Sequence, residues 1–592
     1  MQTHTNNPGF LAIAPTRPGS ASHPDVASVF DRLALAGGQV QSIAGALLAT
    51  WGIPAPTSSL ATPLSNTIWS GQTRVDLPTL TGQLASSEDE GLRSMLPPFG
   101  LLGTSGDSLM IASDHMGFRQ LFARRHADWN AWSTSARLLA RLTDTQLRTE
   151  SLLVQSVVGW QLAEHTLYRD VVKLEPGECV TISSDGIQSR LPEPHLAPSL
   201  NLAEAIPAAV EALRTFSERY MDEYTDPIVQ LTGGLDSRLI LSAIPEGRRR
   251  GLQAMTIGSA NHPDVVRAAE LSARYGMRHT VVDLDGLARL SPAESFERVC
   301  AAAIRLDGMV DPIAKAVTIW AEERVEQGPR IGGVGGEIAR GFYYLGRVSN
   351  GVSVTRARAS QVARWRMFAN EAVDPGLLVS GMTAEAHAYS VDLVFDILRE
   401  TGLDWYRATD ALYAKHRVPR WAGLNESVVC FDRELINPLL DHEYCRLVER
   451  VAPPDKAHAR FFTRLLVALD PELASIPLDG GRPAPATLAS PDISSQLARL
   501  IADSTRIVRK VRQRVLGGRR PAVGAVVLAS NVLEHIRSAP EVLDPLFGLE
   551  LISDDWLAGV SAGTLSPSPA SIAFVINVLM NLPDAPPEPL GR

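Results

Sequence analysis

Short apolar runs separated by Gly, Pro and Ser fill the first 200 residues of the chain. FLAIA at 10–14, SLMIAS at 108–113 and CVTISS at 179–184 are examples. Runs of this length between turn residues are typical of β-strands. A proline-rich stretch at 191–199 then indicates a linker. The pattern therefore predicts a β-rich first domain over residues 1–200, with some helix.

From residue 201 the pattern changes to helices alternating with strands. Apolar residues at 201–224 have helical spacing, and PIVQL at 227–231 is typical of a short buried strand. Further apolar runs at 252–258 and 279–284 are separated by a helical pattern at 263–275. Strands alternating with helices at this spacing predict a parallel, doubly wound sheet.

The later part of the chain is mostly helical. Residues 355–475 are arginine-rich with helical patterning, and a Gly/Pro stretch at 478–491 separates a last helical segment. We therefore expect a second domain over residues 201–480 and a helical C-terminal extension over 481–592.

Composition narrows the functional classes. The 592 residues carry 56 Lys+Arg against 65 Asp+Glu, and a net charge of −9 argues against nucleic-acid binding by bulk electrostatics. Four widely spaced cysteines without a CxxC pair argue against a zinc motif and a dense disulfide framework. The sequence shows no signal peptide, and no apolar run reaches the roughly 18 residues of a membrane span. We expect a cytoplasmic protein without nucleic-acid or membrane partners.

Lysine is rare in this chain, which mainly indicates a base-composition bias of the genome and makes each lysine worth attention. The five lysines are Lys173, Lys315, Lys415, Lys456 and Lys510.

A glycine turn stands directly between the strand at 227–231 and a following helical pattern. It is Thr232-Gly233-Gly234-Leu235-Asp236-Ser237. Glycines let the backbone approach a ligand, and the helix N-terminus favours an anion, so the turn suits phosphate or pyrophosphate. Asp236 can hold the Mg²⁺ that neutralises such a group. The alternative is a turn that only joins strand to helix. The turn is neither a Walker A loop nor a GxGxxG motif.

The turn resembles the SGGxDS pyrophosphate loop of ATP-pyrophosphatase enzymes, with Thr232 in place of the first serine. The segment 256–279 is similar to the second strand and helix of asparagine synthetases, through Gly258, Pro263-Asp264 and His279. A structural role at a strand edge is the favoured explanation of His279.

A second glycine-rich segment resembles the GDGADE motif of asparagine synthetases. It is Gly333-Val334-Gly335-Gly336-Glu337, followed by Tyr343 at the tyrosine that often closes the motif. The resemblance implies that Glu337 is the second metal-coordinating carboxylate, although the family has Asp there. Val334 replaces an acidic residue of the family.

The resemblance also indicates catalytic residues. Asn425–Ser427 and Asn437–Asp441 are similar to the family's ExRxPFLD segment, which implies an active-site role for Glu426; a solvated helix carboxylate is the alternative. The family's catalytic lysine has no clear counterpart. Arg482 is nearest in position, and Lys510 is a weaker candidate.

The first domain resembles the glutaminase half of the same family. Asp114-His115-Met116-Gly117 and 168–177 match its motifs, and the resemblance spans roughly residues 10–480. A working glutaminase needs a cysteine at the mature N-terminus, whereas residue 2 is Gln and the first cysteine is Cys179. We therefore expect a degenerate domain that does not hydrolyse glutamine.

The resemblance implies an α/β protein. A degenerate Ntn-hydrolase-like αββα domain would precede a doubly wound parallel-sheet PP-loop synthetase domain with a helical C-terminal part. The implied cofactors are ATP and Mg²⁺, with Asp236 and Glu337 as metal ligands and Glu426 and Arg482 as catalytic residues. The implied ATP or pyrophosphate contacts are Leu231, Thr232, Gly233, Gly234, Leu235, Asp236, Ser237, Ile257, Gly332, Gly333 and Gly335.

The implied reaction is activation of a carboxylate as an acyl-adenylate, release of pyrophosphate, and amide formation. The carboxylate belongs to a small molecule or a peptide. A peptide macrocyclase like the lasso-peptide cyclases, served by a precursor peptide and its protease, is favoured over a small-molecule ligase like the β-lactam synthetases. The alternatives are an asparagine synthase that uses ammonia and a degenerate nucleotide- or peptide-binding protein. The sequence leaves the substrates and the oligomeric state open.

Overall fold

The computed structural model describes most of the chain between residues 7 and 582. The described ranges are 7–16, 24–33, 35, 38–71, 73–86, 89–143, 145–192, 198–368, 372–478, 482–490 and 524–582. Lys510 lies outside them.

Two antiparallel sheets form the N-terminal part, as the apolar runs predict. The six-stranded sheet has the order β11-β9-β10-β1-β3-β2 and the five-stranded sheet the order β13-β12-β8-β7-β4. The strands of the first are β1 (Gly9–Pro15), β2 (Gln39–Ile43), β3 (Ala46–Trp51), β9 (Phe122–Arg125), β10 (Trp129–Ser133) and β11 (Val171–Lys173). Those of the second are β4 (Thr62–Pro63), β7 (Gly100–Ser105), β8 (Ser108–Ser113), β12 (Cys179–Ser183) and β13 (Gly186–Arg190).

The two sheets pack face to face, and helices cover their outer faces. Phe10 and Ala12 of β1 point into a core shared with Ile111 of the second sheet. Leu11 and Ile13 alternate to the other face and pack with the helices α1 (Val26–Arg32), α4 (Ala136–Ala140) and α5 (Thr149–Val158). The helices α2 (Leu77–Ser86) and α3 (Asp89–Arg93) cover the second sheet. The predicted αββα layering is therefore confirmed.

A parallel five-stranded sheet follows, with the order β16-β15-β14-β17-β18. Its strands are β14 (Ile228–Gln230), β15 (Gln253–Ile257), β16 (Arg278–Val282), β17 (Arg330–Ile331) and β18 (Leu435–Ile436). The first three strands were predicted; β17 and β18 were not, because two residues give no periodic signal. The chain runs outward from β14 to β16 and then crosses to β17 on the other side of β14. The switch point of this doubly wound sheet therefore lies at β14 and β17.

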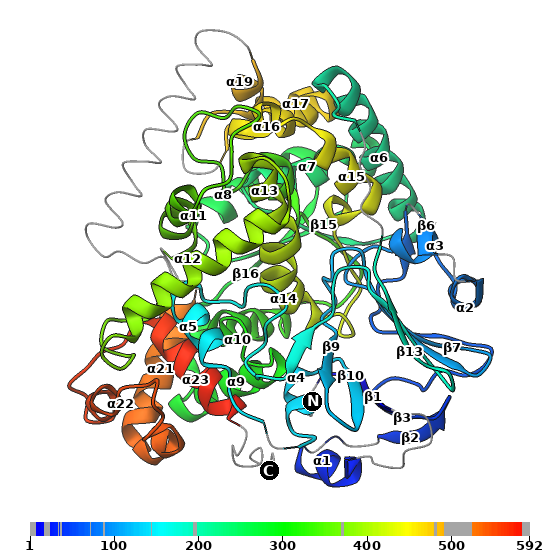
Figure 1. Cartoon of the computed structure of the whole chain (residues 1–592). Coiled ribbons are helices and arrows are strands. Elements are labelled where there is room, and N and C mark those ends of the chain that lie inside the picture. Colours follow the sequence, from blue (N-terminus) through cyan, green and yellow to red (C-terminus); the bar gives the residue numbers. More distant parts are fainter. Residues whose placement is uncertain are drawn as a thin grey trace.

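Helices enclose the parallel sheet on both sides. They are α6 (Leu202–Glu223), α7 (Leu235–Ala243), α8 (Pro263–Tyr275), α9 (Pro292–Arg305) and α10 (Pro312–Glu322). Figure 1 shows α6, α7 and α17 (Arg460–Leu469) above the sheet and α9, α10 and α21 (Ala525–Ser538) below it.

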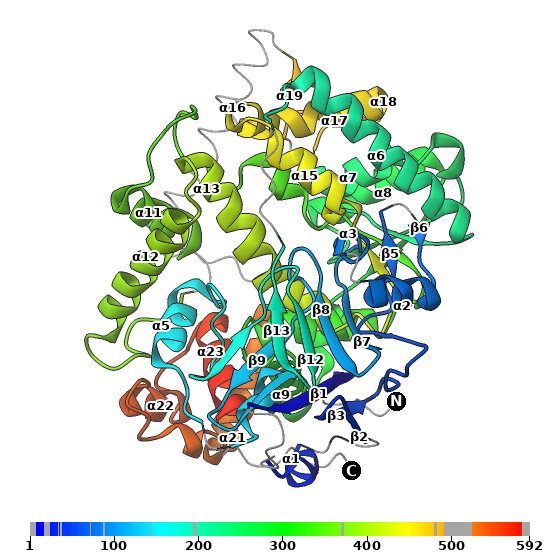
Figure 2. The same ribbon diagram turned by 45° about the vertical axis from the view of Figure 1, so that its right-hand side comes forward.

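The C-terminal helices pack onto the rest of the molecule. The helices of this half are α11 (Arg356–Val362), α12 (Met382–Glu400), α13 (Trp405–Leu412), α14 (Leu424–Ser427), α15 (His442–Arg450), α16 (Pro453–Lys456), α18 (Pro471–Ser475), α19 (Pro485–Ala489), α22 (Asp554–Ser561) and α23 (Pro569–Asn581). Helices α21 and α23 contact α9 and α10, and α5 lies against α12 and α23 (Figure 2). The segment after residue 524 is thus part of the common core.

A π-helix joins the two halves of the molecule. It is η5 (Tyr413–Gly423), and Gln120 of the N-terminal part donates a hydrogen bond of 2.9 Å to its Pro419 carbonyl. A Cβ on Gly423 would lie 2.5 Å from the Phe118 carbonyl oxygen, so the backbones of these two segments of the chain are in direct contact. Among the described residues, no helix combines the length and apolarity that a membrane crossing requires.

Candidate functional site

Both glycine turns lie at the switch point of the parallel sheet. Strands β14 and β17 are parallel neighbours, and each is followed at its carboxyl end by one turn. A Cβ on Gly333 would stand 2.9 Å from the backbone carbon of Asp236, and one on Gly336 would overlap its Oδ1. Glycine is therefore required at both positions for the turns to meet. Carboxyl ends of strands at a switch point are where open α/β sheets bind ligands.

Hydrogen bonds within the first turn fix its shape. The Ser237 hydroxyl accepts from the Thr232 N–H at 3.0 Å and donates to the Thr232 carbonyl at 3.1 Å. The Thr232 hydroxyl accepts from the Gly234 N–H at 3.2 Å, so the threonine has a defined place in the turn. Asp264 at the start of α8 accepts from the Gly233 N–H at 3.1 Å. Helix α7 begins at Leu235 without a side-chain cap, which leaves its N-terminus suited to an anion.

The other predicted nucleotide contacts lie at the same edge of the sheet. Leu231 follows β14, Ile257 ends β15 and Gly332 follows β17. A Cβ on Gly332 would meet the Asn437 Oδ1 at 2.7 Å, and the same oxygen accepts from the Val334 N–H at 3.3 Å. The structure thus brings together all the residues for which nucleotide contacts were expected.

Asp236 and Glu337, the predicted metal ligands, face one arginine. Arg340 Nη2 lies 2.7 Å from Asp236 Oδ2 and 3.2 Å from Glu337 Oε1. Burial raises the pKa of Asp236 to about 7, although the nearby charges of Arg340 and Arg482 act in the opposite direction. The two carboxylates are therefore held together by a resident cation.

The carboxylate pair fits a divalent cation in one respect. Asp236 Oδ1 is buried and has no hydrogen-bond partner. Proteins usually bind Mg²⁺ through one or two carboxylates, with substrate phosphates and water as further ligands. In the described part of the chain, no group of three or more His, Cys, Asp or Glu side chains can hold a metal ion. Phosphate oxygens would therefore have to complete a site at Asp236 and Glu337.

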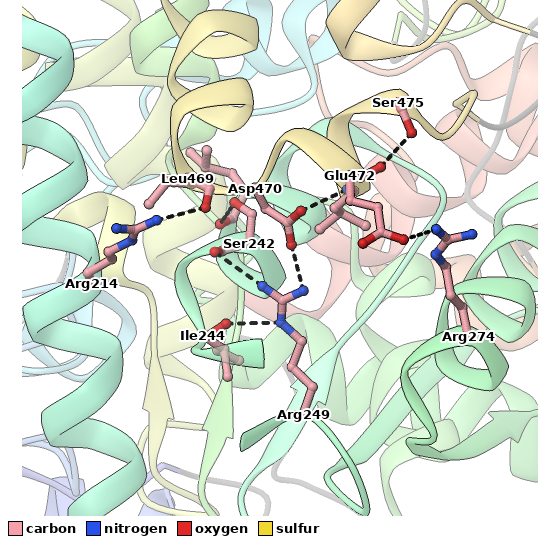
Figure 3. Close-up of polar contacts among 11 residues, drawn as sticks. Arg214, Ser242, Ile244, Arg249, Arg274, Leu469, Asp470, Glu472 and Ser475 are labelled. Carbon is pink, nitrogen blue, oxygen red and sulfur yellow. Dashed lines mark hydrogen bonds and ion pairs between the residues drawn. The ribbon is translucent and has the colours of Figure 1, made fainter. Parts of the chain in front are cut away.

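Arg482 reaches the first turn through an anchored segment. Buried Arg238, one residue after the turn, donates to the carbonyls of Ile476 at 2.6 Å and Pro477 at 2.7 Å. A second contact holds the chain just before Ile476: Arg249 pairs with Asp470 at 2.6 Å (Figure 3). The Arg482 carbonyl accepts from the Leu478 N–H at 3.1 Å, next to this anchor, and its exposed side chain carries a charge that lowers the pKa of Asp236.

Glu426 lies in a different cluster of charges. It belongs to the short helix α14, and its pKa is raised by burial, with Lys315 and Arg433 opposing. Arg433 pairs at 2.9 Å with Glu322, which also pairs with Arg330 at the start of β17. The glycine turns follow the opposite ends of the strands. The structure therefore does not bring Glu426 together with the residues predicted to contact a nucleotide.

Three residues outside the predicted set of site residues form a buried network beside the second turn. Lys456 Nζ lies 2.9 Å from Asp410 Oδ2, and the Tyr344 hydroxyl donates to the same oxygen at 2.8 Å. Lys456 precedes the 3₁₀ helix η7 (Ala457–Ala459), which contacts η3 (Gly336–Arg340). Its rarity marked Lys456 as a candidate, but no local motif connects it to Asp410.

Aromatic rings cover this side of the site. Tyr413, the first residue of η5, packs against Phe342 at 4.6 Å and Tyr343 at 5.7 Å between ring centroids. Burial raises the pKa of Tyr413, and the charge of Glu337 adds to the rise. The tyrosine expected to close the second motif, Tyr343, therefore contributes to a wall beside the carboxylates.

The N-terminal domain supports the second turn through His115. Its Nε2 lies 3.0 Å from the Leu440 carbonyl oxygen, and Leu440 packs where a Cβ on Gly335 would lie. Gly335 has a φ of +101°, a conformation that favours glycine. The first domain thus supports the second glycine turn, which agrees with a scaffold role.

This contact predicts a pH-dependent stability. Burial lowers the pKa of His115 to about 3, and the charge of nearby His442 lowers it further. The unfolded chain, with a pKa near 6.5, binds the proton better, so the contribution is complete above about pH 6.5 and is lost on acidification toward pH 3. We expect the difference in unfolding free energy between wild type and His115→Gln to shrink by up to about 2 kcal/mol between pH 7.5 and 4.5. Urea unfolding at both pH values measures it, and a constant difference would contradict the assignment.

Two solved structures show a distant likeness to the chain. No family model matches the chain, and no curated protein matches it. Glutamine phosphoribosylpyrophosphate amidotransferase from B. subtilis, complexed with ADP and GMP, is 11% identical with a TM-score of 0.19, over 46% of this chain and 65% of that one. A structure described as the allosteric regulatory enzyme of purine biosynthesis is 11% identical with a TM-score of 0.21, over 46% and 80%. At these values neither likeness assigns a family or an activity to the chain.

Proposed function

We propose that the protein is an ATP-dependent carbon–nitrogen ligase that activates a carboxylate as an acyl-adenylate and releases pyrophosphate. The observation that carries the proposal is the meeting of two glycine turns at the sheet's switch point, with Asp236 and Glu337 between them. Such an edge, with an uncapped helix N-terminus, is suited to a nucleotide's phosphates.

The residues around the turns would neutralise the leaving pyrophosphate. The N-terminus of α7 supplies partial positive charge, and Arg340 and Arg482 supply full charges close to Asp236. Mg²⁺, held by Asp236 and Glu337 together with phosphate oxygens, would add charge stabilisation. Asp236 and the turn would also hold the α-phosphate in line with the carboxylate that attacks it.

The buried network would serve the second half of the reaction. Lys456 is 2% exposed, and Asp410 fixes its ammonium group beside the second turn. An ammonium group in such a position stabilises the oxyanion that forms when the amine attacks the acyl-adenylate. The Tyr344–Asp410 hydrogen bond provides a path for the proton that the amine loses.

The amine would come from ammonia or from the substrate itself. An amine within the same peptide gains from proximity, which favours a peptide macrocyclase supplied by a precursor peptide and its protease. A small-molecule amide ligase and an asparagine synthase using ammonia are the alternatives. Each would form a defined product that can be assayed. Cytoplasmic location is part of the same proposal.

Pyrophosphate exchange into ATP tests the proposal. The purified protein, Mg²⁺ and labelled pyrophosphate are incubated with a panel of amino acids and of peptides with side-chain carboxylates. Carboxylate-dependent label in ATP supports adenylation. Tight ATP binding without exchange in the presence of any tested carboxylate would overturn the ligase proposal. The protein would then be a nucleotide-binding protein, an alternative that is supported by the contacts of Arg340 with both carboxylates.

Glutamine is not expected to be the nitrogen donor. All four cysteines are buried thiols, and burial raises the pKa of Cys300, Cys430 and Cys445, which disfavours the nucleophilic thiolate. We predict no glutamate release from glutamine, with or without ATP and Mg²⁺. Release that disappears in one of the four Cys→Ala variants would show that a thiol outside the N-terminus does this chemistry.

A further inference from the structure

We infer that Arg340 is a counter-ion that keeps free divalent cations away from Asp236 and Glu337 until ATP brings phosphates to accept its guanidinium. Metal and nucleotide would then bind together, and the metal alone would bind weakly. The inference rests on the proposed function in one respect, namely that the ligand is a metal–nucleotide complex.

The position of Arg340 follows from local structure. The turn continues into the 3₁₀ helix η3 (Gly336–Arg340), in which side chains three residues apart lie above one another. Glu337 and Arg340 therefore share one face, and the turn-to-turn contact brings Asp236 to the same guanidinium. Arg340 Nη2 therefore contacts both Glu337, which is close to it in sequence, and Asp236, which is far from it in sequence.

The surroundings hold the guanidinium in place. Arg340 Nε donates to the Gly336 carbonyl at 3.3 Å, and its guanidinium carbon lies 5.1 Å from the centroid of the Phe462 ring. Its side chain is 19% exposed, and Phe462 is fully buried. Ion pairs with this degree of burial are less screened by salt than surface pairs, and breaking them without a replacement partner is costly.

The charges at the site would make a divalent cation bind differently alone and together with ATP. Two carboxylates and Arg340 leave one net negative charge, and Arg482 nearby cancels it. A free divalent cation would therefore approach the positive charges of Arg340 and of exposed Arg482, and would find Asp236 Oδ1 as a buried carboxylate oxygen without a hydrogen-bond partner. ATP phosphates reverse this situation, because a guanidinium binds phosphate through paired hydrogen bonds and would leave both carboxylates available. Linkage then requires metal and nucleotide to favour each other's binding equally.

Direct metal binding tests the inference without turnover. Mn²⁺ is titrated at pH 8 and its free fraction is followed by electron paramagnetic resonance, with and without the analogue α,β-methylene-ATP. The wild type should bind Mn²⁺ at least about tenfold more tightly with the analogue. Arg340→Met should bind Mn²⁺ alone at least about tenfold more tightly than the wild type, and the analogue should add little.

Two further variants serve as controls. Arg340→Lys retains the cation and should keep much of the coupling, which separates loss of charge from loss of fold. Arg356→Met removes a surface pair with Asp392, whose side chains are 57% and 51% exposed, and should behave like the wild type.

Equal Mn²⁺ affinity of the wild type and Arg340→Met without nucleotide would overturn the inference. If no variant binds the analogue, the proposed function fails, but the comparison of the two proteins with Mn²⁺ alone still decides whether Arg340 excludes the metal.

Discussion

Asp236→Ala should abolish Mg²⁺-dependent pyrophosphate exchange, with a loss of at least about 100-fold in rate, and should leave the fold intact. Of the carboxylate oxygens of Asp236 and Glu337, Asp236 Oδ1 is the one that is both buried and without a hydrogen-bond partner. Asp236 also lies inside the first turn. Its loss removes the metal ligand and also the partner of Arg340. Exchange rates over a Mg²⁺ titration, with circular dichroism as the check of fold, measure the effect.

Asp264→Ala is the matched control for this variant. Asp264 is also an acidic residue that contacts the first turn, through the Gly233 N–H, but its other carboxylate oxygen lies against His262 and not against Arg340. Its loss should loosen the turn and raise the KM for ATP, while the Mg²⁺ dependence stays that of the wild type. Unchanged exchange in Asp236→Ala would remove the first turn from the catalytic site.

The sequence predicts the first turn well because everything that defines it is local. Strand, turn and helix are consecutive from Ile228 to Ala243, so apolar pattern and glycine placement suffice. The second turn needed the family resemblance, since β17 is only two residues long and leaves no periodic trace. Its approach to Asp236 depends on strand order, which no local pattern encodes.

Residues that meet only through tertiary packing were missed or misplaced. Asp410 is on α13 and Lys456 ends α16, so their contact depends on how those helices pack. Glu426 was selected because its segment resembles the family's ExRxPFLD motif. It precedes β18, however, and therefore lies at the amino ends of the parallel strands, away from the turns. Position along the chain does not determine the edge of the sheet.

Lys456→Met should both destabilise the protein and stop amide formation. It leaves Asp410 buried without its cationic partner, which typically costs about 3–5 kcal/mol of unfolding free energy. Amide product should fall by at least about 100-fold in a single turnover, because the developing oxyanion loses its charge partner. Pyrophosphate exchange should fall much less, since Lys456 is not placed on the phosphates.

The double variant Lys456→Met/Asp410→Asn separates the two effects. Replacing both members removes the unpaired buried charge, so most of the lost stability should return, by about 2–3 kcal/mol relative to Lys456→Met alone. Amide formation should not return, because no cation is restored. Urea unfolding and a single-turnover assay on the same three proteins give both quantities. Amide formation that recovers together with stability would show that Lys456 acts only through packing, and that the second half of the reaction needs another residue.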